Sequence, residues 1–272
     1  MPFLFDTDVP TTAKIPSLLA MGGGTIIRYV ARGETSYGKV IKRPEAYAIM
    51  ATKGKIKLGL VYETNGRPNG TQMGTLEGQA ALSWSKFIGA PKRAGIWGTV
   101  DYDAGESAVP GTKAWFKAFR EALADYYRLG AYASGFMGDE LKAAGLVDFN
   151  TWLTDSRGFA KTKIDLAAKN YTIDQLLPEN FDGLDADPDV KVSPDVDIGD
   201  FIPELPLPTV IEAGDNAVTW LQVRLGICTG TSVGVDGIFG PGTVEALKAF
   251  QTSNRLSPTG KADAVTIAAL NA

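Results

Sequence analysis

The chain has 272 residues, of which 44% are apolar and 21% charged, a composition typical of globular proteins with room for one large and one small domain. It contains no histidine and one cysteine, Cys228, which excludes an intrachain disulfide, histidine-dependent nucleophilic catalysis and histidine-ligated zinc. Residues 1–181 carry a net charge of +4, too small to indicate nucleic-acid binding. No apolar stretch reaches the ~18 residues that a membrane span needs.

Short β-like runs alternate with helical stretches through the first part of the chain. We expect strands at 3–6, 25–30, 57–62, 95–103, 131–134 and 149–153, the last two strands within 163–168 and 181–185, and helices at 13–21, 43–52, 77–88, 113–129 and 139–144. Repeated strand–helix units predict a parallel sheet, so we expect an α/β fold of the (β/α)8 TIM-barrel type over residues 1–187. An open doubly wound sheet is the alternative, but its glycine-rich loop should follow the first strand, whereas the glycines at 22–24 follow the first helix.

The pattern changes after residue 187. Residues 188–208 combine prolines with acidic side chains, which predicts an extended, semi-rigid linker. Residues 209–272 have helical periodicity at 215–225, 244–254 and 264–270, and Asp263 is placed to cap the last helix. We therefore expect a small all-α three-helix domain at the C-terminus.

Three motifs characterise this C-terminal segment: VTWLQ at 218–222, VDGIFGPGT at 235–243 and AFQ at 249–251. The Asp-Gly pair inside the second motif favours a tight turn between two helices. Together the motifs resemble the three-helix peptidoglycan-binding-domain family over nearly its full length. The resemblance implies peptidoglycan as the partner, and we assign wall binding to Gln222, Asp236, Gly237, Phe239 and Gly240.

Carboxylates gather at the C-terminal ends of the predicted strands, the rim at which barrels of this type hold their active sites. They are Asp6 and Asp8 after the first strand, Glu63 after the third, Asp101 and Asp103 at the fourth, and Asp185 and Asp187 at the last. Glycoside hydrolysis needs one carboxylic acid to protonate the leaving oxygen and a second carboxylate to stabilise or attack the sugar. A single strand-end aspartate more often caps a turn, but four converging strand ends favour an active site.

The motifs FDTD (5–8), RYV (28–30), RPEA (43–46), LVYE (60–63) and VDYD (100–103) resemble a glycoside-hydrolase-like family related to the family 25 lysozymes. The resemblance covers about residues 3–187 and implies that Asp6, Asp101 and Asp185 occupy the family's acid positions. The position of the family's general acid, a glutamate, holds Asp103. Because aspartate is one methylene shorter, Glu63 is the alternative proton donor.

Other side chains near the same strand ends are candidates for substrate binding. The aromatic candidates are Tyr29, Tyr62, Tyr102, Tyr132 and Trp152, each of which suits stacking on sugar rings or core packing. Arg28 suits a clamp for a substrate carboxylate or an ion pair with a rim aspartate, and Asp8 is a further polar contact.

Taken together, the resemblances imply a lysozyme-like peptidoglycan hydrolase, an N-acetylmuramidase that cleaves the β-1,4 bond between N-acetylmuramic acid and N-acetylglucosamine. Asp103 or Glu63 would donate the proton, Asp101 would stabilise the reacting centre or activate water, and Asp6 and Asp185 would position the substrate. We expect a monomer that needs no metal or cofactor and neither binds nucleic acid nor inserts into membranes. The alternative is a non-catalytic or differently specific wall-binding protein with a degenerate barrel site.

The N-terminal residues lack the basic and apolar regions of a secretory signal peptide. This pattern predicts a bacteriolytic enzyme that is made in the cytoplasm and released onto the wall, as phage endolysins are. A bacterial autolysin whose signal has been removed is the alternative.

Overall fold

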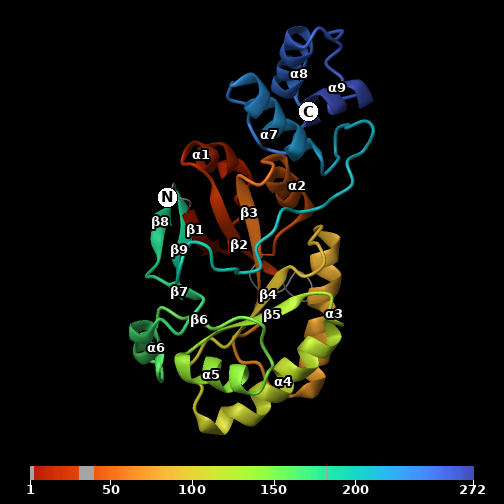
Figure 1. Ribbon diagram of the computed structural model, residues 1–272. Coiled ribbons are helices and arrows are strands. Elements are labelled where there is room, and N and C mark those ends of the chain that lie inside the picture. The colour runs from red at the N-terminus through yellow and green to blue at the C-terminus, as the bar shows by residue number, and fades with distance from the viewer. Residues whose placement is uncertain (1–2, 31–39, 182) are drawn as a thin grey trace.

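The computed structural model describes residues 3–30, 40–181 and 183–272. Its strands form one closed barrel in the order β1-β2-β3-β4-β5-β6-β7-β9, with β8 paired to the outer part of β9 (Figure 1). The strands are β1 (Phe3–Thr7), β2 (Gly24–Val30), β3 (Ile56–Tyr62), β4 (Gly95–Thr99), β5 (Arg128–Ala133), β6 (Trp152–Leu153), β7 (Ile173–Gln175), β8 (Glu179–Phe181) and β9 (Leu184–Lys191). The predicted (β/α)8-type barrel is therefore confirmed.

The strand that closes the barrel runs against the others. Strands β1 to β7 pair in parallel, whereas β9 is antiparallel to both β7 and β1. Its register places Asp187 opposite Asp6 and Asp189 opposite Gln175. The N-terminal half of β9 therefore reaches the rim at which β1 to β7 end.

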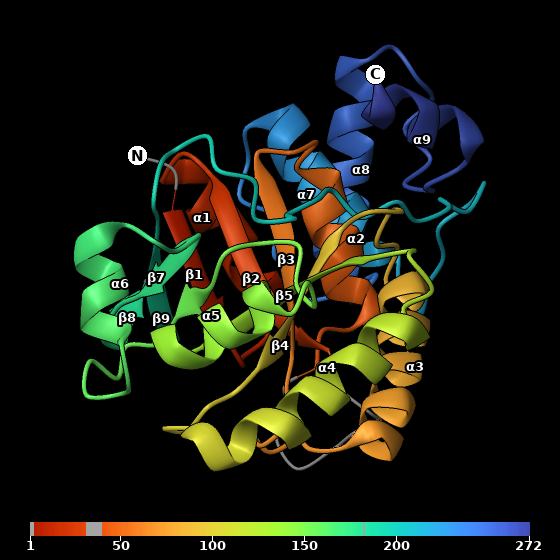
Figure 2. The same ribbon diagram turned by 60° about the horizontal axis from the view of Figure 1, so that its bottom comes forward.

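Helices cover the outside of the barrel (Figures 1 and 2). They are α1 (Ile15–Ala20), α2 (Arg43–Ala51), α3 (Thr71–Phe87), α4 (Val109–Ala122), α5 (Gly135–Ala143) and α6 (Thr162–Ala168), with 3-10 turns at Thr12–Lys14 and Glu106–Ala108. Helices α3 and α4 are in close contact at Gly74. A Cβ atom there would lie 2.4 Å from the carbonyl oxygen of Trp115, so only a residue without a side chain fits. None of the helices in the described residues is long and apolar enough to span a bilayer.

Two of the predicted strands are wrong. Residues 163–168 form helix α6, in which Asp165 is buried and pairs with Lys161 one helical turn earlier. A short apolar run fits a strand or a helix equally well, so the periodicity alone misleads here. In the second, 181–185, Phe181 ends β8 and Leu184 begins β9, so the described residues belong to two strands and not to one.

The segment predicted as a linker, 188–208, packs against the barrel. Its first residues belong to β9, which ends at Lys191. Further on, Phe201 exchanges main-chain hydrogen bonds with Leu58, and the carbonyl of Ile198 accepts a 3.1 Å bond from the Trp97 indole. Ile198 joins the cluster of side chains that fills the barrel interior. The segment therefore closes the barrel at the end opposite the carboxyl rim and does not act as a free tether.

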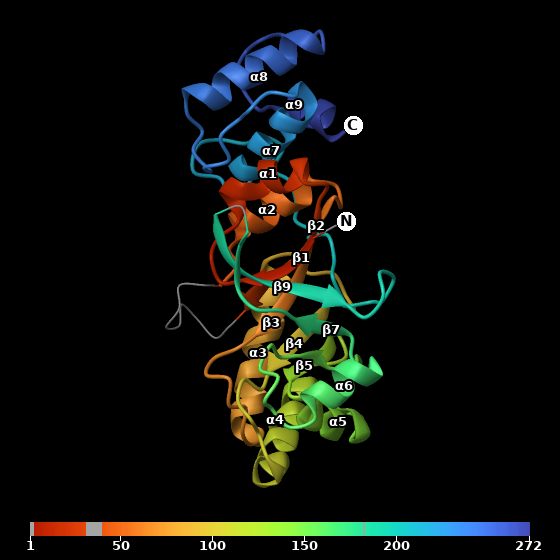
Figure 3. The same ribbon diagram turned by 90° about the vertical axis from the view of Figure 1, so that its left-hand side faces the viewer.

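The predicted three-helix C-terminal domain is confirmed, and it docks on the barrel. Its helices are α7 (Val218–Thr229), α8 (Pro241–Ser253) and α9 (Ala264–Asn271). They lie beside α1 and α2 and away from α4 to α6 (Figures 1 and 3). Every residue of α7 from Val218 to Leu225 is buried, as expected for a helix enclosed on all sides. The Thr219 hydroxyl donates a 2.5 Å hydrogen bond to the Pro44 carbonyl of α2.

Helix α7 packs both within the three-helix domain and against the barrel. The full chain should therefore unfold in one cooperative calorimetric transition. Val223 is 4% exposed and lines, with Pro16 and Leu19, a 390 Å³ space between α1 and α7. Val223→Asp would bury a carboxylate there and should lower the Tm of the single transition by roughly 10 °C. Val265→Asp, at a 63% exposed position of α9, is the matched control and should leave Tm within about 2 °C. Two separate transitions, one of which has the same Tm in the wild type and in Val223→Asp, would contradict the shared core.

Candidate functional site

A cavity of 210 Å³ opens at the carboxyl rim of the barrel. Its lining comes from the ends of all eight barrel strands and the turns that follow them. The lining residues are Asp6, Tyr29, Val61, Glu63, Thr99, Asp101, Tyr132, Trp152, Asp155, Gln175 and Asp187. Five of these carry carboxyl groups, so the predicted convergence of acids at this rim occurs in the structure.

Asp6 is the most deeply buried acid of the cavity, with 2% of its surface exposed. Its Oδ2 accepts a 2.9 Å hydrogen bond from the Gln175 amide, and its Oδ1 accepts one of 3.4 Å from the Tyr29 hydroxyl. Burial, and next the charge of Asp187, raise the pKa of Asp6 to about 8, although both hydrogen bonds oppose the rise. Asp6 is therefore protonated at neutral pH.

Glu63 and Asp101 flank a glycine at the open side of the cavity. The main-chain N–H of Asp101 donates a 2.9 Å hydrogen bond to the Gly66 carbonyl. A Cβ atom at Gly66, whose φ is +65°, would lie 2.8 Å from the Asp101 Cβ and 3.4 Å from the Glu63 Oε1. The absence of a side chain at Gly66 thus lets the two acids approach the same point. Desolvation, and next the charge of Asp155, raise the pKa of Asp101.

Strand β9 contributes two acids at different depths. Asp187 lines the cavity, and burial followed by the charge of Asp155 raises its pKa. Asp189 lies deeper, and its Oδ1 accepts a 2.8 Å bond from the indole of Trp152. Burial, and next the charge of Asp6, raise the pKa of Asp189 well above its usual range. The barrel interior thus holds several neighbouring acids that favour their neutral forms.

Arg28 does not reach the cavity, which corrects its assignment to substrate binding. The side chain is fully buried and pairs with Glu45 of α2 at 2.9 Å. Glu45 also accepts hydrogen bonds from the Thr11 main chain and hydroxyl, and a second Arg28 nitrogen donates to the Thr7 carbonyl. The pair therefore fixes the end of β1, directly beside Asp6, and offers a substrate no free donor.

Five other predicted residues, Asp8 among them, lie outside the cavity lining. Asp103 is exposed and accepts a 3.0 Å hydrogen bond from the Ala160 main chain, because the chain leaves the strand at Thr99 and a loop orients the side chain. Tyr62 is buried against Trp115 and Phe119. In a separate contact, the Tyr102 ring lies under the Arg67 guanidinium. Asp185, on β9, is exposed, and Asp187 occupies the cavity in its place.

Asp8 follows β1, is half-buried and lies close enough to raise the pKa of Asp187. Tyr132 and Trp152 do line the cavity, but both are buried and hydrogen-bonded, so they form its floor. Four lining residues, Val61, Thr99, Asp155 and Gln175, were not predicted from the sequence. The strand-end rule would have found Asp155, which follows β6 by two residues.

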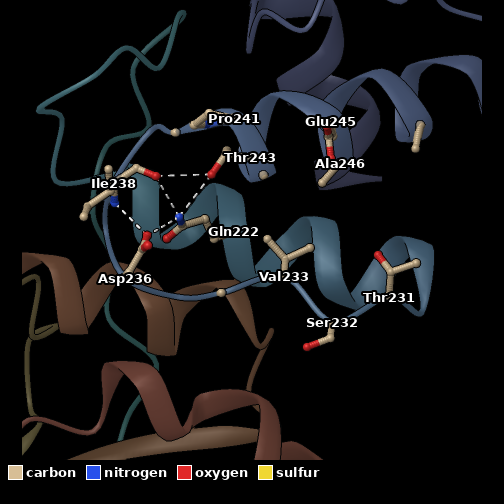
Figure 4. Close-up of a pocket in the computed structure, with 14 residues that line it drawn as sticks. Gln222, Thr231, Ser232, Val233, Asp236, Ile238, Pro241, Thr243, Glu245 and Ala246 are labelled. Carbon is tan, nitrogen blue, oxygen red and sulfur yellow. Dashed lines mark hydrogen bonds between the residues drawn. The ribbon is translucent and has the colours of Figure 1, made fainter.

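A second cavity, of 570 Å³, lies in the C-terminal domain at the start of α8 (Figure 4). The exposed side chain of Ile238 and the loop before Pro241 form one side of it, and Thr231 and Ser232 form another. Of the predicted wall-binding residues, Gln222, Asp236 and Gly240 line this groove, the last two in accessible positions, whereas Gly237 and Phe239 are absent from its lining.

Gln222 has a structural role in this domain. It is 1% exposed; its Oε1 accepts from the Gly237 main chain, and its Nε2 donates to Asp236, Ile238 and Thr243 (Figure 4). Gln251 repeats the arrangement on α8. Its Oε1 accepts from Gly260, and its Nε2 donates to Thr259, Lys261 and Thr266. Each glutamine therefore holds the loop before the next helix, and little of Gln222 is exposed at the groove that it lines.

Comparison with known proteins agrees with both parts of the chain. Residues 17–182 match the family described as Rv2525c-like, glycoside hydrolase-like domain. The chain belongs to this family. Residues 214–270 match the putative peptidoglycan binding domain family. The resemblances inferred from the sequence motifs are thereby confirmed, and the glycoside-hydrolase-like barrel is joined to a peptidoglycan-binding domain. No curated protein sequence matches the chain.

Solved structures share the barrel. The Tat-secreted protein Rv2525c of Mycobacterium tuberculosis, in complexes with HEPES and with L-tartrate, is 17% identical, with a TM-score of 0.58 over 73% of this chain and 98% of that one. An uncharacterized B. stearothermophilus protein is 16% identical, with a TM-score of 0.50 over 70% of this chain and 96% of that one. At such low identity these likenesses show the fold alone.

The burial of Asp6 predicts a specific dependence of stability on pH. Its pKa is about 8 in the folded chain and near the usual 3.8 in the unfolded one, so the wild type loses stability as the pH rises from about 4 to 8. Asp6→Asn removes this loss. The variant should match the wild type at pH 4 and exceed its unfolding free energy at pH 8 by on the order of a few kcal/mol. Urea titrations at both pH values measure this, with Asp103→Asn as the exposed control. Parallel pH curves for wild type and Asp6→Asn would show that Asp6 is ionised at neutral pH.

Substitution of an exposed residue in the groove of the C-terminal domain should change wall binding without changing the stability of the fold. Ile238 is 65% exposed in the groove, so Ile238→Ala should weaken retention on insoluble peptidoglycan several-fold without changing Tm. Val265→Ala, equally exposed on α9, is the control and should bind as the wild type does. Gln222→Ala should instead destabilise the chain by about 1–3 kcal/mol, because it leaves buried loop groups without partners. Unchanged retention of Ile238→Ala would exclude this groove as the binding surface.

Proposed function

We propose that this protein is a peptidoglycan hydrolase that cleaves the glycan strand at the barrel cavity. The observation that carries the proposal is that Glu63 and Asp101 both lie beside Gly66 and line one cavity, where Asp101 has a raised pKa. Two carboxyl groups in different environments are what glycosidic cleavage needs, since one must be protonated and the other ionised. The peptidoglycan-binding domain of the same chain supports the wall as the substrate.

In this proposal Asp101 and Glu63 divide the two roles. Asp101 donates its proton to the leaving glycosidic oxygen, because desolvation and the charge of Asp155 raise its pKa. Glu63 stabilises the positive charge that develops at the anomeric carbon, or activates the attacking water. Asp103 is exposed and outside the cavity, so it is the weaker candidate for the acid. The bond we propose is the β-1,4 linkage between N-acetylmuramic acid and N-acetylglucosamine, as in the family 25 lysozymes that the sequence resembles.

Purified walls test the reaction directly. The full chain should lower the turbidity of a wall suspension and release new reducing ends without new amino termini. Borohydride reduction of the products should convert muramic acid, and not glucosamine, to its alcohol. New amino termini would assign the protein to the amidases or peptidases. Retention on the walls without any new end would favour the non-catalytic binding protein.

Substitutions then separate the carboxyl groups. Asp101→Asn and Glu63→Gln should each lower the rate of reducing-end release about 10²-fold or more, because each removes a group that acts where charge develops. Asp103→Asn is the control, since it makes the same change outside the cavity, and should retain at least about half the rate. A dead Asp103→Asn beside an active Asp101→Asn would reverse the assignment of the proton donor.

A further inference from the structure

One buried amide in the cavity faces two acids at once. Gln175, the last residue of β7, is 6% exposed. Its Nε2 lies 2.9 Å from the Asp6 Oδ2 and 3.4 Å from the Asp187 Oδ2. An amide nitrogen has two N–H groups, so Gln175 has one donor for each carboxyl group. The two acids come from β1 and β9, the strands whose pairing closes the barrel.

The orientation of this amide is set by a neighbour. The Tyr132 hydroxyl donates a 2.7 Å hydrogen bond to the Gln175 Oε1. A flipped amide would lose that bond and turn its oxygen toward two carboxyl groups, so the flip is doubly unfavourable. The main chain is also held, because the Arg157 guanidinium donates a 2.9 Å bond to the Gln175 carbonyl and a 2.6 Å bond to Asp174. Gln175 is therefore fixed at its side chain and at its backbone.

We propose that Gln175 is a positioning residue that bridges Asp6 and Asp187 and makes them act as one acid–base pair behind the reacting carboxyl groups. The inference rests on the proposed glycan cleavage for its role, but the bridge itself is a property of the folded chain. Its two N–H groups stabilise negative charge on either acid, so Gln175 limits how far burial and mutual repulsion raise the pKa of Asp6. Glu63 and Asp101 then act beside a pair whose total charge is set by Gln175.

The electrostatic surroundings of Asp6 make this bridge necessary. Titratable groups face Asp6 from every neighbouring strand: Tyr29 of β2, Glu63 after β3, Tyr132 of β5, and Asp187 and Asp189 of β9. The acids and the low-dielectric surroundings favour the neutral form of Asp6. Of the two hydrogen bonds to Asp6, the one from Gln175 lowers its pKa more than the one from Tyr29 does. Removal of the amide should therefore move the titration of Asp6 further from its ordinary range.

Gln175→Leu tests the bridge without any assay of activity. The wild type should lose unfolding free energy with rising pH up to about pH 8, where Asp6 ionises. In Gln175→Leu this decline should continue to a pH about one unit higher, because a hydrogen bond to the charged form is lost. Gln72→Leu makes the same change at an exposed position of α3 and should leave the end of the decline unmoved. An unchanged end point in Gln175→Leu would overturn the proposal.

The pH profile of reducing-end release gives the second readout. In Gln175→Leu the alkaline limb of this profile should move to higher pH. The kcat should fall, and KM should change little. Gln175→Glu keeps the shape and can donate a hydrogen bond while protonated, so it should restore the rate at acidic pH and lose it at alkaline pH. Equal rates of Gln175→Glu and Gln175→Leu at acidic pH would show that the amide serves packing alone.

Two measures keep the test decisive. If Gln175→Leu fails to fold, Tyr132→Phe removes the bond that orients the amide, and it should shift the stability curve in the same direction by a smaller amount; no shift would refute the bridge. If walls treated with the wild-type protein show no new reducing ends, the proposed reaction fails. The stability curves still decide whether Gln175 sets the titration of Asp6.

Discussion

Closure of the barrel by an antiparallel strand is the constraint from which the site geometry follows. Strand β9 forms main-chain hydrogen bonds with β1 on one edge and β7 on the other, so its register is fixed from both sides. Directly paired residues of neighbouring strands face the same side, which places Asp187 beside Asp6 and Asp189 beside Gln175. A parallel eighth strand of the same sequence would reverse the depths of these acids and place Asp189 nearer the rim than Asp187.

This arrangement concentrates groups that are costly to bury. Asp6 and Asp189 lie in a low-dielectric interior, where the ionised form is disfavoured and ionisation lowers the stability of the fold. Specific hydrogen bonds from Gln175, Tyr29 and Trp152 limit the cost. The neighbouring Arg28–Glu45 pair makes a different contribution. It is buried and fully hydrogen-bonded, and its bond to the Thr7 carbonyl holds the end of β1 in place.

The C-terminal domain shares a hydrophobic core with the barrel. Helix α7 contributes to the three-helix core and to the contact with α1 and α2, so one hydrophobic cluster runs from the barrel into the domain. The segment before it is held against the barrel through Phe201 and Ile198. The groove at α8 therefore keeps a defined position relative to the barrel cavity. Wall binding would orient the cavity as well as raise its local concentration.

The barrel, the three-helix domain and the gathering of acids at one rim could all be predicted from the amino-acid sequence. Strand–helix alternation and motif spacing are local properties, and parallel strands must end together. Tertiary structure decided which polar residues face the cavity. Arg28 and Tyr62 lie in strands that border the site, yet packing against Glu45 and Trp115 buries both. Asp103, two residues from Asp101, turns away because the strand has already ended. The antiparallel direction of β9 and the contact of Gln175 with Asp6 join residues far apart in the chain, and no local pattern encodes them.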